Sequence, residues 1–63
     1  MITVKMSAYD KNAKIWKFIK EWQSKDLKSA ENVFHMFEQA FNAADGTRLA
    51  ADFYKDGEWI CEM

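Results

Sequence analysis

The sequence is poor in the residues that crosslink small proteins or bind metals. It has one cysteine, Cys61, and one histidine, His35, among 63 residues. A single cysteine excludes an internal disulfide, and the two residues together cannot supply the four ligands of a structural zinc site. A chain of this length buries only about 60% of the surface of its unfolded state. Its stability must therefore come from a compact apolar core or from association with another chain.

The chain also has no proline, only two glycines and no long apolar run. Gly46 and Gly57 stand at expected turns, so no glycine-rich loop is present to hold a phosphate group. No segment approaches the roughly 20 apolar residues of a transmembrane helix, and no charged and apolar leader marks the chain for export. Together with a free thiol, these features predict a cytoplasmic protein with a single domain over residues 1–63.

Catalytic chemistry has few candidate residues. The carboxylates form no recognisable acid–base pair, and a dyad of Cys61 and His35 would also need a site for an oxyanion. The sequence therefore predicts a protein that is not an enzyme and needs no cofactor. Aromatic residues make up 16% of the chain and hydrophobic residues 49%. This composition is typical of a folded domain rather than a disordered segment.

Charge is unevenly distributed along the chain. Residues 1–30 carry seven lysines against three acidic residues, a net charge of +4, whereas residues 31–63 carry two basic residues against seven acidic ones, a net charge of −5. One interpretation is that these are simply solvated faces. The other is a bipolar surface that steers the protein toward a charged partner.

The first third of the chain predicts a hairpin, with one open alternative. Residues 2–8 alternate between apolar and polar side chains, as in a half-buried strand, and residues 10–13 are typical of a turn. Residues 15–22 place apolar side chains at the spacing of an amphipathic helix, but isoleucine and aromatic residues favour a strand. We expect a second strand here, with a helix over residues 12–24 as the alternative.

The middle of the chain predicts one long helix over residues 26–44. Asp26 is a suitable N-cap, because its carboxylate can accept hydrogen bonds from the exposed amides of the first turn. Asp45-Gly46 supplies the end, because glycine readily adopts the left-handed conformation after the last turn. The apolar stripe recurs every three or four residues and comprises Leu27, Ala30, Val33, Phe34, Phe37, Ala40, Phe41 and Ala44.

The last third, with "TRLAADFY" and "EWICE" around Asp56-Gly57, predicts a second hairpin. The expected fold is therefore α+β, a four-stranded antiparallel sheet in the order β-β-α-β-β with the single helix, about 26–44, on one face. If residues 12–24 are helical instead, the order becomes β-α-α-β-β.

The register of the second hairpin predicts which side chains face the helix. A two-residue turn places Tyr54 opposite Trp59 and Phe53 opposite Ile60, and it also pairs Lys55 with Glu58 and Asp52 with Cys61. Because side chains alternate between the two faces of a sheet, Phe53 and Ile60 are expected against the helix. Tyr54, Trp59, Asp52 and Cys61 are then expected on the uncovered face.

The second strand adds to this uncovered face. If Ile15 and Ile19 point to the core, then Trp16, Phe18 and Trp22 join Tyr54 and Trp59 on the other side. Contiguous exposed apolar surface of this kind marks an interaction site. In the opposite orientation, Trp16 and Phe18 belong to the core and the lysine-bearing face of the strand is outside.

The sequence thus predicts a protein-binding face. Its expected contact residues are Trp16, Trp22, Tyr54 and Trp59, with Lys17, Lys20, Asp52 and Glu58 at the rim. A nucleic-acid-binding domain is the second hypothesis, because aromatic residues on a sheet can stack on single-stranded bases. The slightly negative net charge and the single arginine argue against it. A homodimeric regulatory domain is also open.

The element order, the helix "DLKSAENVFHMF" and the closing hairpin "YKDGEWIC" give the chain a loose likeness to known proteins. It resembles small phage-encoded inhibitor proteins, including anti-CRISPR and host-takeover proteins. The resemblance implies stoichiometric binding to a larger host protein or ribonucleoprotein complex in the host cytoplasm, without catalysis. It assigns no functional residue. If acidic side chains imitate nucleic-acid phosphates, the candidates are Glu31, Glu38, Asp45, Asp52, Asp56, Glu58 and Glu62.

Overall fold

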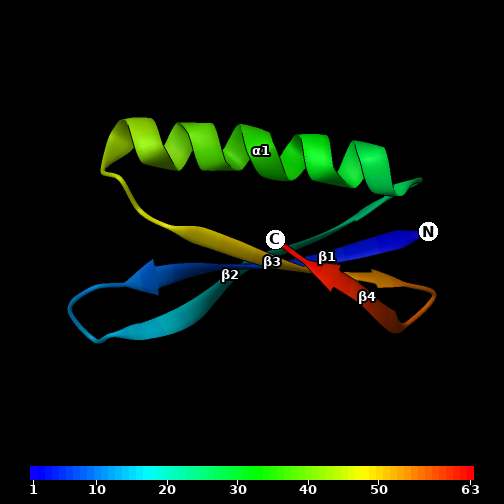
Figure 1. Cartoon of the computed structure of the whole chain (residues 1–63), viewed down its shortest axis with the longest axis horizontal. Coiled ribbons are helices and arrows are strands. Elements are labelled where there is room, and N and C mark those ends of the chain that lie inside the picture. The colour runs from blue at the N-terminus through cyan, green and yellow to red at the C-terminus, as the bar shows by residue number, and fades with distance from the viewer.

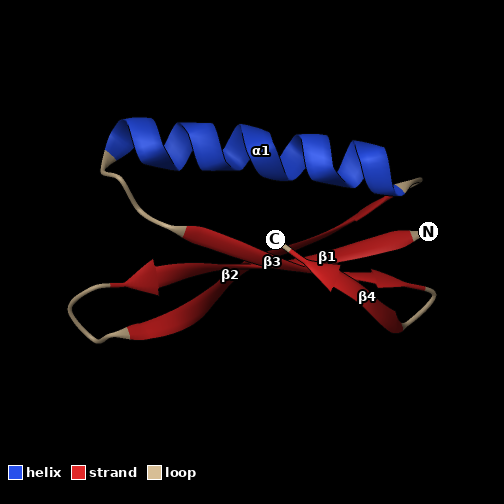
Figure 2. Cartoon of the chain, in the orientation of Figure 1, coloured by secondary structure: helices blue, strands red, loops and turns tan.

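The computed structural model describes all residues 1–63 and contains one helix and four strands. These are β1 (Ile2–Asp10), β2 (Ile15–Ser24), α1 (Leu27–Ala44), β3 (Leu49–Lys55) and β4 (Glu58–Glu62). The strands form one antiparallel sheet in the order β2-β1-β3-β4, and α1 lies along one face of it (Figures 1 and 2). The predicted β-β-α-β-β fold is confirmed, and residues 15–24 form a strand. No helix of the molecule is long and apolar enough to cross a lipid bilayer.

Local hydrogen bonds explain where the elements begin and end. At the β1–β2 turn, the Asp10 carboxylate accepts from the backbone amides of Asn12 (2.9 Å) and Ala13 (3.2 Å). Asp26 caps α1 by accepting from the Ser29 amide at 2.8 Å, and this hydrogen bond is the main cause of its lowered pKa. After α1, Gly46 adopts a positive φ of 76°. The predicted helix boundaries are therefore confirmed at both ends.

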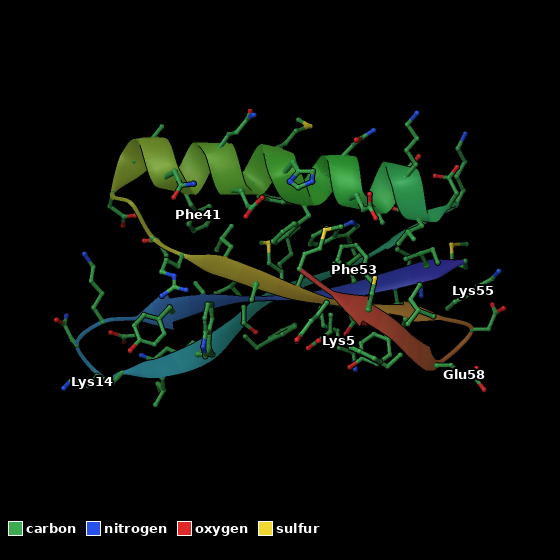
Figure 3. The ribbon with its side chains drawn as sticks, viewed as in Figure 1. Lys5, Lys14, Phe41, Phe53, Lys55 and Glu58 are labelled. Atoms are coloured by element: carbon green, nitrogen blue, oxygen red, sulfur yellow. The ribbon has the colours of Figure 1, made fainter.

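The core lies between α1 and the two central strands. The rings of Phe34 and Phe53 meet edge to face, with centroids 6.3 Å apart, and Phe53 projects from β3 toward the helix (Figure 3). Only seven residues are buried, namely Ile2, Val4, Met6, Ala30, Phe34, Ala51 and Phe53. The face of the sheet opposite α1, here called the open face, contributes none of them.

The register of the second hairpin differs from the prediction after its first two pairs. Trp59 lies opposite Tyr54 as expected, but the register then shifts, so that Cys61 rather than Ile60 lies opposite Phe53. This is a β-bulge, in which two residues of one strand face one residue of its partner. Cys61 consequently packs against the core, whereas Ile60 is exposed. The same shift corrects the predicted pair of Asp52 with Cys61, because Glu62 lies opposite Asp52.

A second bulge, in β2, corrects the predicted position of Trp22. Lys20 pairs with Met6 and Phe18 pairs with Ser7, which leaves Ile19 without a partner in the ladder. Trp22 therefore lies on the helix side, with its ring centroid 5.5 Å from that of Phe37, and not on the open face.

Neither isoleucine of β2 reaches the core, although both were predicted there. Ile15 lies on the same face as Lys17, the predicted side of the strand, but it is exposed. Ile19 is the inserted residue of the bulge and is also exposed. The prediction assumed strict alternation along β2, whereas one inserted residue exchanges the faces of the residues beyond it.

Candidate protein-binding face

The open face is organised in four rows that run across the strands. Backbone register places the following side chains side by side: an aromatic row of Trp16, Tyr9 and Arg48; a central row of Phe18, Ser7 and Ala50; a charged row of Glu21, Lys5, Asp52 and Glu62; and an outer row of Gln23, Thr3, Tyr54 and Trp59. Each row comes from strands that are far apart in the sequence. The sheet therefore assembles one surface from both hairpins.

The aromatic row is held by contacts between β1 and its two neighbours. The rings of Tyr9 and Trp16 pack edge to face, with centroids 5.3 Å apart. The Tyr9 amide donates to the carbonyl oxygen of Arg48 at 2.9 Å. Trp16 is nevertheless 47% exposed. Phe18, which lies in the adjacent central row, is 62% exposed. These rings are positioned by the fold without being covered by it.

Contacts between the charged row and the outer row fix the other end of the face. The Trp59 indole nitrogen donates to the Asp52 carboxylate at 3.1 Å, which orients both groups. The Lys5 ammonium lies 5.0 Å from the centroid of the Tyr54 ring, a distance suited to a cation–π interaction. Figure 3 shows Lys5 on the side of the sheet away from the helix. Trp59 remains 56% exposed.

A groove of about 630 Å³ lies over β3 between the aromatic and charged rows. The groove forms because the central row has only the small side chains of Ser7 and Ala50 at this point. Its full lining is Ser7, Trp16, Arg48, Leu49, Ala50, Ala51, Asp52, Glu62 and Met63. Arg48 and Glu62 make no ion pair. The groove is thus bordered by an unpaired cation on one side and an unpaired carboxylate on the other.

The structure brings together four of the eight predicted contact residues. Trp16, Tyr54, Trp59 and Asp52 share the open face. The other four lie elsewhere, as Trp22, Lys17 and Lys20 belong to the helix-side set of β2, and Glu58 pairs with Lys55 next to the turn.

The two predicted rim lysines have partners inside the chain. The Lys17 ammonium lies 2.9 Å from the Asp10 carboxylate, and this hydrogen bond is the main reason why the pKa of Asp10 is lowered. The Lys20 ammonium lies 5.8 Å from the centroid of the Phe37 ring, which again places it on the side of α1. Neither lysine therefore borders the open face.

The sequence did not identify three residues of the open face. Ser7 and Arg48 line the groove, and Tyr9 packs against Trp16 beside it. Tyr9 and Ser7 alternate with the buried residues of β1, so the alternation that identified the strand also placed them on the uncovered side. Arg48 gave no such signal, because it precedes β3 and its position depends on pairing with Tyr9. That pairing joins residues 39 positions apart in the sequence, which local patterns do not report.

A second pocket of about 400 Å³, lined mainly by polar residues, lies between the β1–β2 turn and the segment after α1. It is lined by Tyr9, Lys11, Lys14, Gly46, Thr47 and Arg48. The nearby Asp45 carboxylate is already engaged, because it accepts from the hydroxyl and the amide of Thr47. These hydrogen bonds lower the pKa of Asp45. Three basic side chains therefore border a pocket without an acidic residue in its lining.

Comparisons with protein-family models, with curated protein sequences and with solved structures found no match to this chain.

Proposed function

We propose that the chain is a non-enzymatic protein-binding module and that the open face is its binding surface. The observation that carries this proposal is the exposure of three large aromatic side chains, Trp16, Phe18 and Trp59, on one face of the sheet. Large exposed apolar patches on small domains mark interaction sites. Tryptophan and tyrosine also contribute a disproportionate share of the binding energy in protein interfaces.

The charges around the aromatic side chains define the partner that fits. An acidic group on the partner would complement Arg48, and a basic group would complement Asp52 and Glu62. These two groups should be about 13 Å apart, because Arg48 and Asp52 are four residues apart on an extended chain that rises about 3.3 Å per residue. Apolar side chains of the partner would fill the groove between them. Complementary charges at such positions select the partner and its orientation.

A narrower proposal follows from the resemblance to small phage-encoded inhibitors. In this version the partner is a host protein or ribonucleoprotein complex, which the chain blocks by stoichiometric binding through the same face. The proposal is supported by the resemblance and by the exposed aromatic side chains.

Trp59→Ala tests the proposed binding surface. Tagged wild-type chain is expected to capture a defined partner from bacterial lysate, and Trp59→Ala is expected to lose most of that partner because an exposed anchor is removed. Met36→Ala is the matched control, since Met36 is 68% exposed but projects from α1. Circular dichroism must show that both variants are folded. Equal capture of the same partner by all three chains would refute the open face as the binding surface.

A single-stranded nucleic acid is the second candidate partner, and the basic pocket is the observation that favours it. Lys11, Lys14 and Arg48 border this pocket, and the Trp16 ring packs edge to face against Tyr9, which belongs to the lining. A phosphate in the pocket would leave the next base within reach of an exposed indole ring. Cationic grooves flanked by aromatic residues are typical of proteins that bind single strands.

Salt dependence tests this second candidate. A fluorescent oligothymidylate is expected to bind in low salt and to dissociate as salt rises, with the logarithmic slope reduced by about 0.7 for each phosphate contact that is removed. Lys11→Ala combined with Lys14→Ala should reduce the slope, whereas Lys25→Ala combined with Lys28→Ala, away from the pocket, should not. Absence of binding in low salt would exclude this candidate.

A further inference from the structure

The open face carries complementary features on one patch, which is the requirement for a two-fold symmetric dimer. Arg48, which directly precedes β3, and Ala50 and Asp52 within β3 are successive residues of the open face. With a rise of about 3.3 Å per residue, Arg48 and Asp52 each lie roughly 7 Å from Ala50, on opposite sides. The central row is therefore midway between a cation and an anion.

We infer that the partner of the open face is a second copy of this chain, with the two-fold axis lying along the central row. This inference rests on the proposed function of the open face. Rotation about this axis places the aromatic row of each copy over the charged row of the other. Arg48 of one copy then meets Asp52 of the other, with Glu62 beside it. The same operation makes this contact twice.

The remaining side chains of the two rows also match under this rotation. Tyr9 meets the partner copy's Lys5, which suits a cation–π contact, and Trp16 meets its Glu21, a pair of an indole donor and a carboxylate acceptor. Phe18 lies on the axis and meets its own counterpart. The small side chains of Ser7 and Ala50 allow two sheets to approach to about 10 Å, the usual spacing of stacked sheets.

The β2 edge of the sheet is a poorer site for self-association than the open face. Pairing of β2 with the β2 of a second copy would bring Lys14, Lys17 and Lys20 of each chain toward the same lysines of the other. Lysine on an edge strand opposes this kind of pairing. Face-to-face packing instead covers the exposed Phe18 and Trp16 and leaves α1 of each copy outside. The product is a four-layer α/β/β/α dimer.

Exchange of charges between positions 48 and 52 tests this arrangement by sedimentation velocity. The wild-type chain is expected to sediment at twice its monomer mass of 7.4 kDa. Arg48→Asp and Asp52→Arg are each expected to be monomeric, because each places like charges opposite each other at both contacts.

An equimolar mixture of the two variants is expected to dimerise. The carboxylate introduced at position 48 of one chain meets the guanidinium introduced at position 52 of the other, and the native Arg48 meets the native Asp52. The double variant with both exchanges is also expected to dimerise, because both contacts are restored with reversed sign. Rescue in the mixture is specific to this pairing, since a merely structural role of either residue would not produce it.

Lys28→Glu is the control, because it changes the net charge as much as Arg48→Asp but lies on α1. It should remain dimeric, and circular dichroism should show every variant to be folded. A wild-type chain that stays monomeric at its highest soluble concentration overturns the inference, as does a dimer that survives both single exchanges. Either result leaves the proposed protein-binding function standing, since the open face is then available to another protein, whose capture the Trp59→Ala variant tests.

Discussion

Replacing Phe53 by alanine is expected to remove a large part of the free energy of unfolding and to lower the urea midpoint sharply. Phe53 is fully buried and meets Phe34 edge to face at the centre of the core. Truncation of a buried phenylalanine costs about 3–5 kcal/mol. Stabilities of about 0.05–0.15 kcal/mol per residue give a domain of this length only about 3–9 kcal/mol in total. One substitution therefore removes a large part of the stability.

Urea denaturation followed by circular dichroism measures this effect. Because self-association would stabilise the folded state by mass action, wild type and variant must be compared at one protein concentration. Met36→Ala removes a large but exposed side chain and should unfold at nearly the wild-type midpoint. A Phe53→Ala chain with an unchanged midpoint would show that the core does not lie between α1 and β3.

Alanine substitution of the two tryptophans of β2 is expected to affect different properties, stability at Trp22 and binding at Trp16. Trp22→Ala should lower the free energy of unfolding by about 3 kcal/mol, because its ring packs against Phe37 on the helix side. Trp16→Ala should leave the free energy of unfolding nearly unchanged, apart from the contact with Tyr9. On the proposed function, it should weaken binding at the open face by roughly 30-fold, the effect of losing about 2 kcal/mol at an interface anchor.

At position 22, the Trp22→Phe variant separates the contribution of ring packing from the cost of the unpaired indole N–H. The indole nitrogen of Trp22 is buried without a hydrogen-bond partner, and a buried unsatisfied donor is destabilising by about 1–3 kcal/mol. Phenylalanine keeps an aromatic ring and removes this donor, so the Phe variant should be clearly more stable than the Ala variant. If Trp16→Ala rather than Trp22→Ala unfolds the chain, the assignment of the two faces of β2 is wrong.

The elements of this fold could be predicted because their signals are local. Asp26 and Gly46 lie at the two ends of α1, and Asp56-Gly57 forms the β3–β4 turn with positive φ at both residues. Alternation in β1 identifies its buried side from the residues of that strand alone. Each of these features depends on neighbouring residues, and each is borne out by the structure.

The two bulges could not be predicted in the same way. Ile19 and Ile60 are residues that favour strands, and their side-chain chemistry gives no indication that each is unpaired in the ladder. Because each bulge reverses the alternation beyond it, an error of one residue moved Trp22 and Cys61 to the wrong face while leaving Trp16, Tyr54 and Trp59 correctly placed.

The bulge at Ile19 divides β2 into two segments under different selective constraints. Beyond the bulge, Trp22 packs against the core, and few side chains can replace it without loss of folding. From Ile15 to Phe18 its side chains are exposed, and substitutions there leave the packing around Phe37 undisturbed. On the proposed function, the hairpin end of the strand can therefore change its binding preference by substitution while Trp22 preserves the fold.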